Sequence, residues 1–157
     1  MKPAPILIFA YGNPSRGDDA LGPAMYDLLH EKLSEDVELL TDFQLQIEHS
    51  IDLEQRDCVL FIDASMSATA PFHFYRLQAE RDNSFTSHAM SPASLLDAYE
   101  KINKQQPPPS FMLEIRGYEF GLGQPMSEQA AFNLNQADSF ISNLVDTEIR
   151  DWSSLCK

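Results

Sequence analysis

The chain has 157 residues, of which 43% are hydrophobic and 22% are charged. This composition is typical of a globular domain, so we expect a single domain over residues 1–157. The 24 acidic and 11 basic residues give a formal net charge of −13, which disfavours nucleic acid and anionic membrane as partners and favours metal ions or basic peptides. On composition alone, the simpler interpretation is preferred, namely that this charge maintains solubility.

The first half of the chain predicts three strands, one helix and a polar connection. The apolar run Ile6–Tyr11 is typical of a strand buried on both faces. A helical period begins at Asp19, and its apolar stripe consists of Leu21, Met25, Leu28, Leu29 and Leu33. A second strand is predicted at Val37–Phe43, and residues 44–55 form a polar connection with room for one helical turn. A third buried strand is predicted at Val59–Ile62.

The second half predicts two more strands and two more helices. Residues Phe72–Leu77 alternate bulky and polar side chains, which indicates a strand near a sheet edge. Ser91 followed by proline indicates the start of a helix, and a last strand is predicted at Phe111–Tyr118. Ser127 opens the final helix. This alternation predicts a three-layer α/β domain, with a twisted, mostly parallel sheet of about five strands flanked by helices.

Residues capable of metal binding follow the predicted strands. Asp18 and Asp19 come after the first strand, Asp63 ends the third, and His88 follows the fourth. Ligands in open α/β sheets gather beyond the carboxyl ends of the strands. An Asp/Asp/His set suits a divalent transition metal such as nickel or zinc. The lack of a thiolate argues against a closed structural zinc site, and two or three protein ligands leave positions for water or substrate.

Each of these residues also has a simpler explanation. Asp18 or Asp19 can cap a helix, and Asp63 can accept hydrogen bonds from loop amides. His88 can be a solvated loop histidine. The functional hypothesis depends on the coincidence of all three positions at one sheet edge.

Other residues and mechanisms have weaker support. His49 is a reserve candidate because its polar loop follows the second strand, and Glu114 could assist as a general acid or base. Cys58 reads as a buried hydrophobe and forms no recognisable metal or disulfide pattern with Cys156. The glycine-containing loop after the first strand lacks the dinucleotide-binding spacing and a P-loop lysine. The sequence also has no G-x-S-x-G or H-E-x-x-H motif.

Three segments resemble the motifs of the hydrogenase maturation proteases. Residues 9–23 contain a strand, a glycine–asparagine turn, and an acidic pair followed by a glycine. Residues 59–64 form a strand that ends in aspartate, and residues 87–91 place a histidine just before a helix. The order and approximate spacing of the three segments agree with that family.

The resemblance implies a protease that removes the C-terminal extension of a [NiFe]-hydrogenase large-subunit precursor after nickel insertion. It implies Asp19, Asp63 and His88 as catalytic and metal-contacting residues, with nickel carried by the substrate rather than held permanently. The family often has glutamate at the position of Asp19. Many relatives carry a glycine-rich turn after the second strand, where this chain has residues 41–49 instead. In this respect the chain looks like the branch of the family that serves soluble NAD-linked hydrogenases.

Two other functions stay open at this point. A non-enzymatic nickel-binding adaptor would use the same three residues without cleaving a peptide, and a general metallopeptidase would carry its own ion. We expect a monomer, because no additional apolar stripe is present. The N-terminal apolar stretch is too short to span a membrane and has no signal-peptide cleavage pattern, so a cytoplasmic location is expected.

Overall fold

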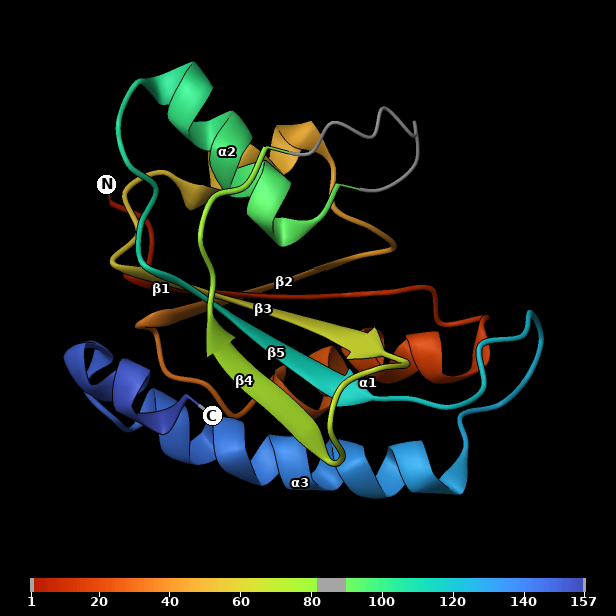
Figure 1. Cartoon of the computed structure of the whole chain (residues 1–157). Coiled ribbons are helices and arrows are strands. Elements are labelled where there is room, and N and C mark those ends of the chain that lie inside the picture. Colours follow the sequence, from red (N-terminus) through yellow and green to blue (C-terminus); the bar gives the residue numbers. More distant parts are fainter. Residues whose placement is uncertain (1, 82–89, 157) are drawn as a thin grey trace.

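A computed structural model describes residues 2–81 and 90–156 as a five-stranded sheet with helices on both faces (Figure 1). The strands are β1 (Ile6–Tyr11), β2 (Val37–Asp42), β3 (Cys58–Ser65), β4 (Phe72–Arg76) and β5 (Ser110–Arg116). Their order in the sheet is β2-β1-β3-β5-β4. All neighbouring pairs are parallel except β4 and β5, which are antiparallel. The predicted α/β fold with a mostly parallel sheet is confirmed.

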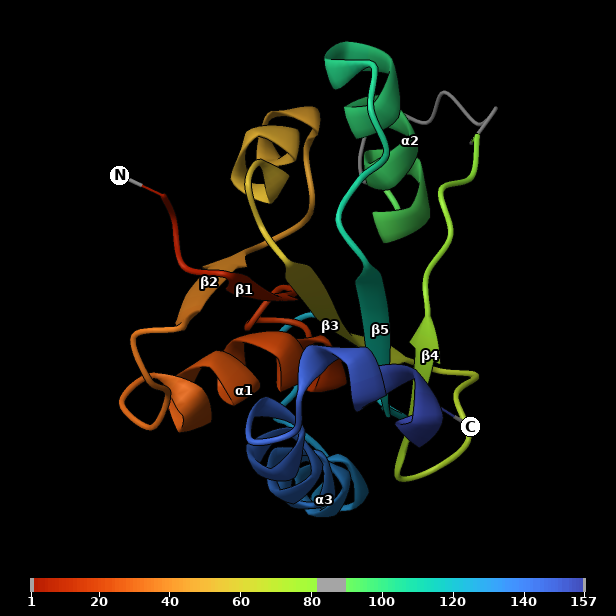
Figure 2. The same ribbon diagram turned by 90° about the vertical axis from the view of Figure 1, so that its left-hand side faces the viewer.

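The helices form two outer layers (Figure 2). The α-helices are α1 (Leu21–Leu29), α2 (Pro92–Asn103) and α3 (Glu128–Val145), and the 3-10 segments are η1 (Gly17–Ala20), η2 (Ile47–Leu53) and η3 (Ile149–Leu155). The segments α2 and η2 cover one face of the sheet, and α1, α3 and η3 cover the other. The predicted serine caps are confirmed, because Ser91 accepts a hydrogen bond from Ser94 N and Ser127 accepts one from Ala130 N.

Strand alternation divides the interior into two cores. In β1, Ile6, Ile8 and Ala10 face the core shared with α1 and α3, whereas Leu7, Phe9 and Tyr11 face the core shared with α2 and η2. The residues of β3 and β5 alternate in the same way. Consequently, polar residues near the carboxyl ends of these strands face the α2 side of the sheet when they alternate in step with Leu7, Phe9 and Tyr11.

The C-terminal segment is packed against the body of the domain. Trp152 in η3 is fully buried, its Nε1 donates to Thr147 O at 3.0 Å, and its ring centroid lies 5.5 Å from that of Phe111. The sequence pattern did not decide between packing and fraying for this segment. Within the described part of the chain, no helix combines the length and apolarity needed to cross a bilayer.

Candidate functional site

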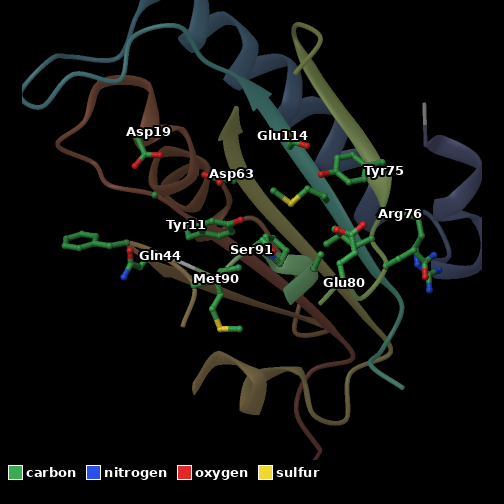
Figure 3. Close-up of a pocket in the computed structure, with 18 residues that line it drawn as sticks. Tyr11, Asp19, Gln44, Asp63, Tyr75, Arg76, Glu80, Met90, Ser91 and Glu114 are labelled. Atoms are coloured by element: carbon green, nitrogen blue, oxygen red, sulfur yellow. The ribbon is translucent and has the colours of Figure 1, made fainter. Parts of the chain in front are cut away.

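A cavity of about 780 Å³ lies on the α2 side of the sheet and is drawn in Figure 3. Its charged and hydroxyl-bearing lining residues include Tyr11, Asp19, Asp63, Tyr75 and Glu114. Asp63 and Glu114 are paired across β3 and β5, with Asp19 on one side of them and Tyr75 on the other. The volume falls within the range of about 300–1,000 Å³ that is usual for ligand sites.

Asp63 is a largely buried carboxyl group on β3. Its Oδ1 accepts a hydrogen bond from Ala64 N at 2.8 Å, and its side chain is also hydrogen-bonded to Tyr11. Burial raises the pKa of Asp63 to about 7, and the negative charges of Asp19 and Glu114 act in the same direction. The folded domain therefore disfavours the ionised form of Asp63, and a positive charge placed beside this carboxylate would stabilise it.

Asp19 lies in η1, directly after the β1 strand and its turn. Its Oδ2 accepts a hydrogen bond from Asn13 N at 2.7 Å, and its backbone N donates to Arg16 O at 3.0 Å. No residue that the structure describes donates a hydrogen bond to Asp19 Oδ1. One carboxylate oxygen is thus fixed by the turn, while the side chain lines the cavity.

The neighbouring Asp18 has a different environment. It is fully buried, and its carboxylate accepts hydrogen bonds from the backbone N atoms of Tyr118, Glu119 and Ser127 and from Ser127 Oγ. Burial alone would raise the pKa of Asp18, but these hydrogen bonds lower it below its ordinary value. Of the two adjacent acids, Asp19 lines the cavity and Asp18 does not.

A second tyrosine–carboxylate pair, Tyr75 and Glu114, lines the cavity beside Asp63. Tyr75 on β4 is hydrogen-bonded to Glu114 on β5. Burial, followed by this contact with Glu114, raises the pKa of Tyr75 above its ordinary value, so its hydroxyl stays protonated at neutral pH. Arg76 is the basic residue among the described lining residues, and its guanidinium lies 5.4 Å from the centre of the Phe111 ring.

His88 lies outside the described residues. Met90 and Ser91, which follow it in the sequence, line the cavity. The prediction that the strand before His88 ends at the same edge as β3 is wrong, because β4 is antiparallel to β5 and its carboxyl end lies at the opposite edge of the sheet. Within residues 2–81 and 90–156, no group of three or more His, Cys, Asp and Glu side chains could hold a metal ion. The role of His88 stays a prediction.

The reserve candidate His49 has a local structural role. Its Nδ1 accepts a hydrogen bond from Gln46 N at 2.8 Å, and its Nε2 lies 3.2 Å from Asp42 Oδ2. Its ring stands edge-on to Phe9 with centroids 4.7 Å apart. These contacts stabilise the start of η2, and His49 is not among the residues that line the main cavity.

Several lining residues were not singled out by sequence reasoning. Tyr11 is one of them: it shares one face of the sheet with Asp63 and Glu114 near the ends of parallel strands, and strand alternation could have placed it on that face. Phe43 is 67% exposed and lines the main cavity together with two adjoining cavities of about 440 and 340 Å³. The available signal was an aromatic residue at the carboxyl end of a predicted strand.

The fold and cavity define a three-layer α/β domain in which one acid from η1 and one from near the carboxyl end of β3 line a cleft beside the sheet. Solved structures with this fold include a [NiFe] hydrogenase maturation protease, HycI, from Thermococcus kodakarensis KOD1, with a TM-score of 0.72, 19% identity, and coverage of 92% of this chain and 94% of that one. The hydrogenase-maturating endopeptidase HybD from E. coli superimposes with a TM-score of 0.71 and 19% identity, covering 93% of each chain.

A third similar structure is the hydrogenase 2 maturation peptidase from Thaumarchaeota archaeon SCGC_AB-539-E09, with a TM-score of 0.65 and 20% identity over 91% of this chain and 99% of that one. No family model matches the sequence, and no curated protein matches it either. At these identities the structural likeness establishes the fold.

Proposed function

We propose that this chain is an endopeptidase that removes the C-terminal extension of a [NiFe]-hydrogenase large-subunit precursor and recognises nickel already bound by that precursor. One observation carries the proposal: Asp19 and Asp63, each from a segment that resembles a maturation-protease motif, line the same cavity. The likeness to three structures named as maturation peptidases, over more than nine tenths of this chain, supports it.

The donor set suits nickel carried by a substrate. Two carboxylates supply oxygen ligands, and the imidazole of His88 would add a nitrogen ligand, a combination compatible with a divalent transition metal. The charge of Asp19 disfavours ionisation of Asp63, and a bound cation would relieve that repulsion. Because none of these ligands is a thiolate, the contact would be weak enough for nickel to stay with the precursor.

The residues of the cavity would act mainly by orientation. Asn13 N holds one oxygen of Asp19, while Ala64 N and Tyr11 hold Asp63. A nickel-bearing substrate that contacts both acids would bring its scissile bond into the cavity in a defined position. Such positioning supplies up to about 7–11 kcal/mol of a reaction barrier in ideal intramolecular cases. Nickel on the substrate would supply Lewis-acid chemistry when it is present.

Alanine substitutions test this assignment. Asp19→Ala, Asp63→Ala and His88→Ala should each lower the cleavage rate of a nickel-loaded precursor by at least tenfold, measured as loss of a short peptide by mass spectrometry. Asp27→Ala removes an exposed acid from α1 and His30→Ala removes an exposed histidine, so both should cleave at the wild-type rate. Full cleavage by the variant lacking all three residues would refute the assignment.

The two alternative functions give different results in the same experiments. An adaptor would bind the precursor, and the three substitutions would weaken binding, but the precursor mass would not change. A general metallopeptidase would retain about one metal ion per chain after purification and would also cleave nickel-free precursor. Elemental analysis of the purified chain and the nickel-free reaction together separate these cases.

A further inference from the structure

Two loops that are about 100 residues apart in the sequence are joined beside Asp19. One connects β1 to α1 and includes η1, and the other connects β5 to α3; Figure 1 shows them side by side. Backbone hydrogen bonds link them from Gly17 N to Gln124 O (3.1 Å), from Gly123 N to Ser15 O (2.7 Å) and from Asp18 N to Glu119 O (2.6 Å). The position of η1 therefore depends on the β5–α3 loop.

The carboxylate of Asp18 is the centre of this junction. It accepts hydrogen bonds from Tyr118 N at 2.7 Å, Glu119 N at 2.9 Å, Ser127 N at 2.7 Å and Ser127 Oγ at 2.8 Å. Hydrogen bonds to an ionised, fully buried acceptor are stronger than those between neutral groups. Glu119 makes two backbone hydrogen bonds with Asp18, because its N donates to the Asp18 carboxylate and its O accepts from Asp18 N.

Asp19 is the next residue in the same 3-10 segment. Successive residues of such a segment are about 120° apart around its axis, because it has about three residues per turn. Fixing Asp18 toward the β5–α3 loop consequently sets the direction of Asp19, which lines the cavity. Asp19 then accepts the hydrogen bond from Asn13 N at 2.7 Å.

We propose that Asp18 is a positioning residue, whose buried carboxylate fixes η1 against the β5–α3 loop and thereby aims Asp19 into the cavity. The activity readout of this inference rests on the proposed function, but its structural readout does not. A purely structural role for Asp18 would lower the stability of the whole domain without specifically disturbing Asp19.

The test uses Asp18→Asn. In either orientation, the asparagine NH₂ group would face at least one backbone N–H donor that now binds the carboxylate, that of Ser127 or those of Tyr118 and Glu119, so the junction should open. The control is a core truncation near the other end of α3, Leu144→Ala or Ile141→Val, whichever matches the urea midpoint of Asp18→Asn. Leu144 is 17 residues beyond Ser127, or about 25 Å along a helix, and both control residues are fully buried.

The structural readout is amide hydrogen exchange measured by NMR. The Asn13 amide donates to Asp19, and the Leu7 amide lies in the middle of the sheet, so the ratio of their exchange rates separates local opening from global unfolding. We expect this ratio to rise at least tenfold in Asp18→Asn and not to rise in the matched control. An unchanged ratio in Asp18→Asn would overturn the inference.

The activity readout is kcat for a nickel-loaded precursor. It should fall at least tenfold in Asp18→Asn and stay within twofold of wild type in the control, both assayed well below their unfolding temperatures. If the wild type cleaves the precursor and Asp18→Asn retains the wild-type kcat, the inference is refuted. If the wild type does not cleave the precursor, the proposed function fails, and the exchange ratio alone then decides the inference. Should Asp18→Asn not fold, Ser127→Ala takes its place; it removes one of the four hydrogen bonds to Asp18 and also the side-chain cap of α3. This variant should raise the same ratio at least threefold, and no rise would refute the inference.

Discussion

Asp63→Asn should stabilise the free protein above neutral pH. Folding raises the pKa of Asp63 from 3.8 to about 7, chiefly through burial, so the fold favours the protonated carboxyl group. The stability that this preference contributes is fully present below about pH 4 and is lost as the pH rises through about 7. Asparagine is neutral at every pH, and its Oδ1 can still accept the hydrogen bond from Ala64 N.

The magnitude follows from the two pKa values. At 1.36 kcal/mol per pKa unit, the difference between 3.8 and about 7 corresponds to about 4 kcal/mol at alkaline pH. Because Asp63 retains some contact with water, we expect a gain on the order of 2–4 kcal/mol at pH 8.5. At pH 4 the two proteins should differ by less than about 1 kcal/mol, since both side chains are then neutral in the folded protein and pH 4 lies close to the unfolded pKa of 3.8.

Urea unfolding at pH 4 and pH 8.5 measures the effect. The control is Asp97→Asn, which removes an acid that pairs with Lys101 at 2.7 Å on the surface of α2. It should change the free energy of unfolding by less than about 0.5 kcal/mol at either pH. If Asp63→Asn is no more stable than wild type at pH 8.5, the claim that the ionised carboxylate of Asp63 destabilises the fold is refuted.

Three further substitutions test other parts of the account. Phe43→Ala should leave stability within about 0.5 kcal/mol of wild type, because the side chain is 67% exposed. It should raise KM for the precursor severalfold in the cleavage assay, because Phe43 lines the cavity, and an unchanged KM would show that Phe43 does not contact the precursor. Gly12→Ala should lower both stability and cleavage, since the residue has φ +153° and a Cβ would collide with the backbone of Asp19; wild-type urea midpoint and activity would contradict that packing. Trp152→Ala should cost about 3–5 kcal/mol in urea unfolding, because the indole is fully buried, and a loss below about 1 kcal/mol would show that η3 is not part of the core.

Much of the fold could be predicted because each layer has a clear local pattern. The apolar runs of β1 and β3 indicated strands covered on both faces, and serine caps marked the starts of α2 and α3. The packing of η3 could not be predicted, because it depends on Trp152 meeting Phe111 from a distant strand. The antiparallel direction of β4 is likewise a tertiary property that no local pattern encodes.

The candidate site was predicted only in part for the same reason. Position after a predicted strand selected Asp18, Asp19 and Asp63, but the sequence could not separate the two adjacent acids. That separation comes from the β5–α3 loop, whose backbone N–H groups surround Asp18 from about 100 residues away. Strand alternation could place Tyr11 on one face of its strand, but its pairing with Asp63 depends on β1 and β3 being neighbours in the sheet, which only the fold shows.

The central claim is cleavage that depends on nickel carried by the substrate. The most direct measurement incubates the wild-type chain with a large-subunit precursor, either nickel-loaded or nickel-free, and follows the precursor mass over time. The account predicts loss of a short C-terminal peptide from the nickel-loaded precursor alone. Equal cleavage of both precursors would contradict recognition of substrate-bound nickel, and no cleavage of a correctly loaded cognate precursor would contradict the endopeptidase function itself.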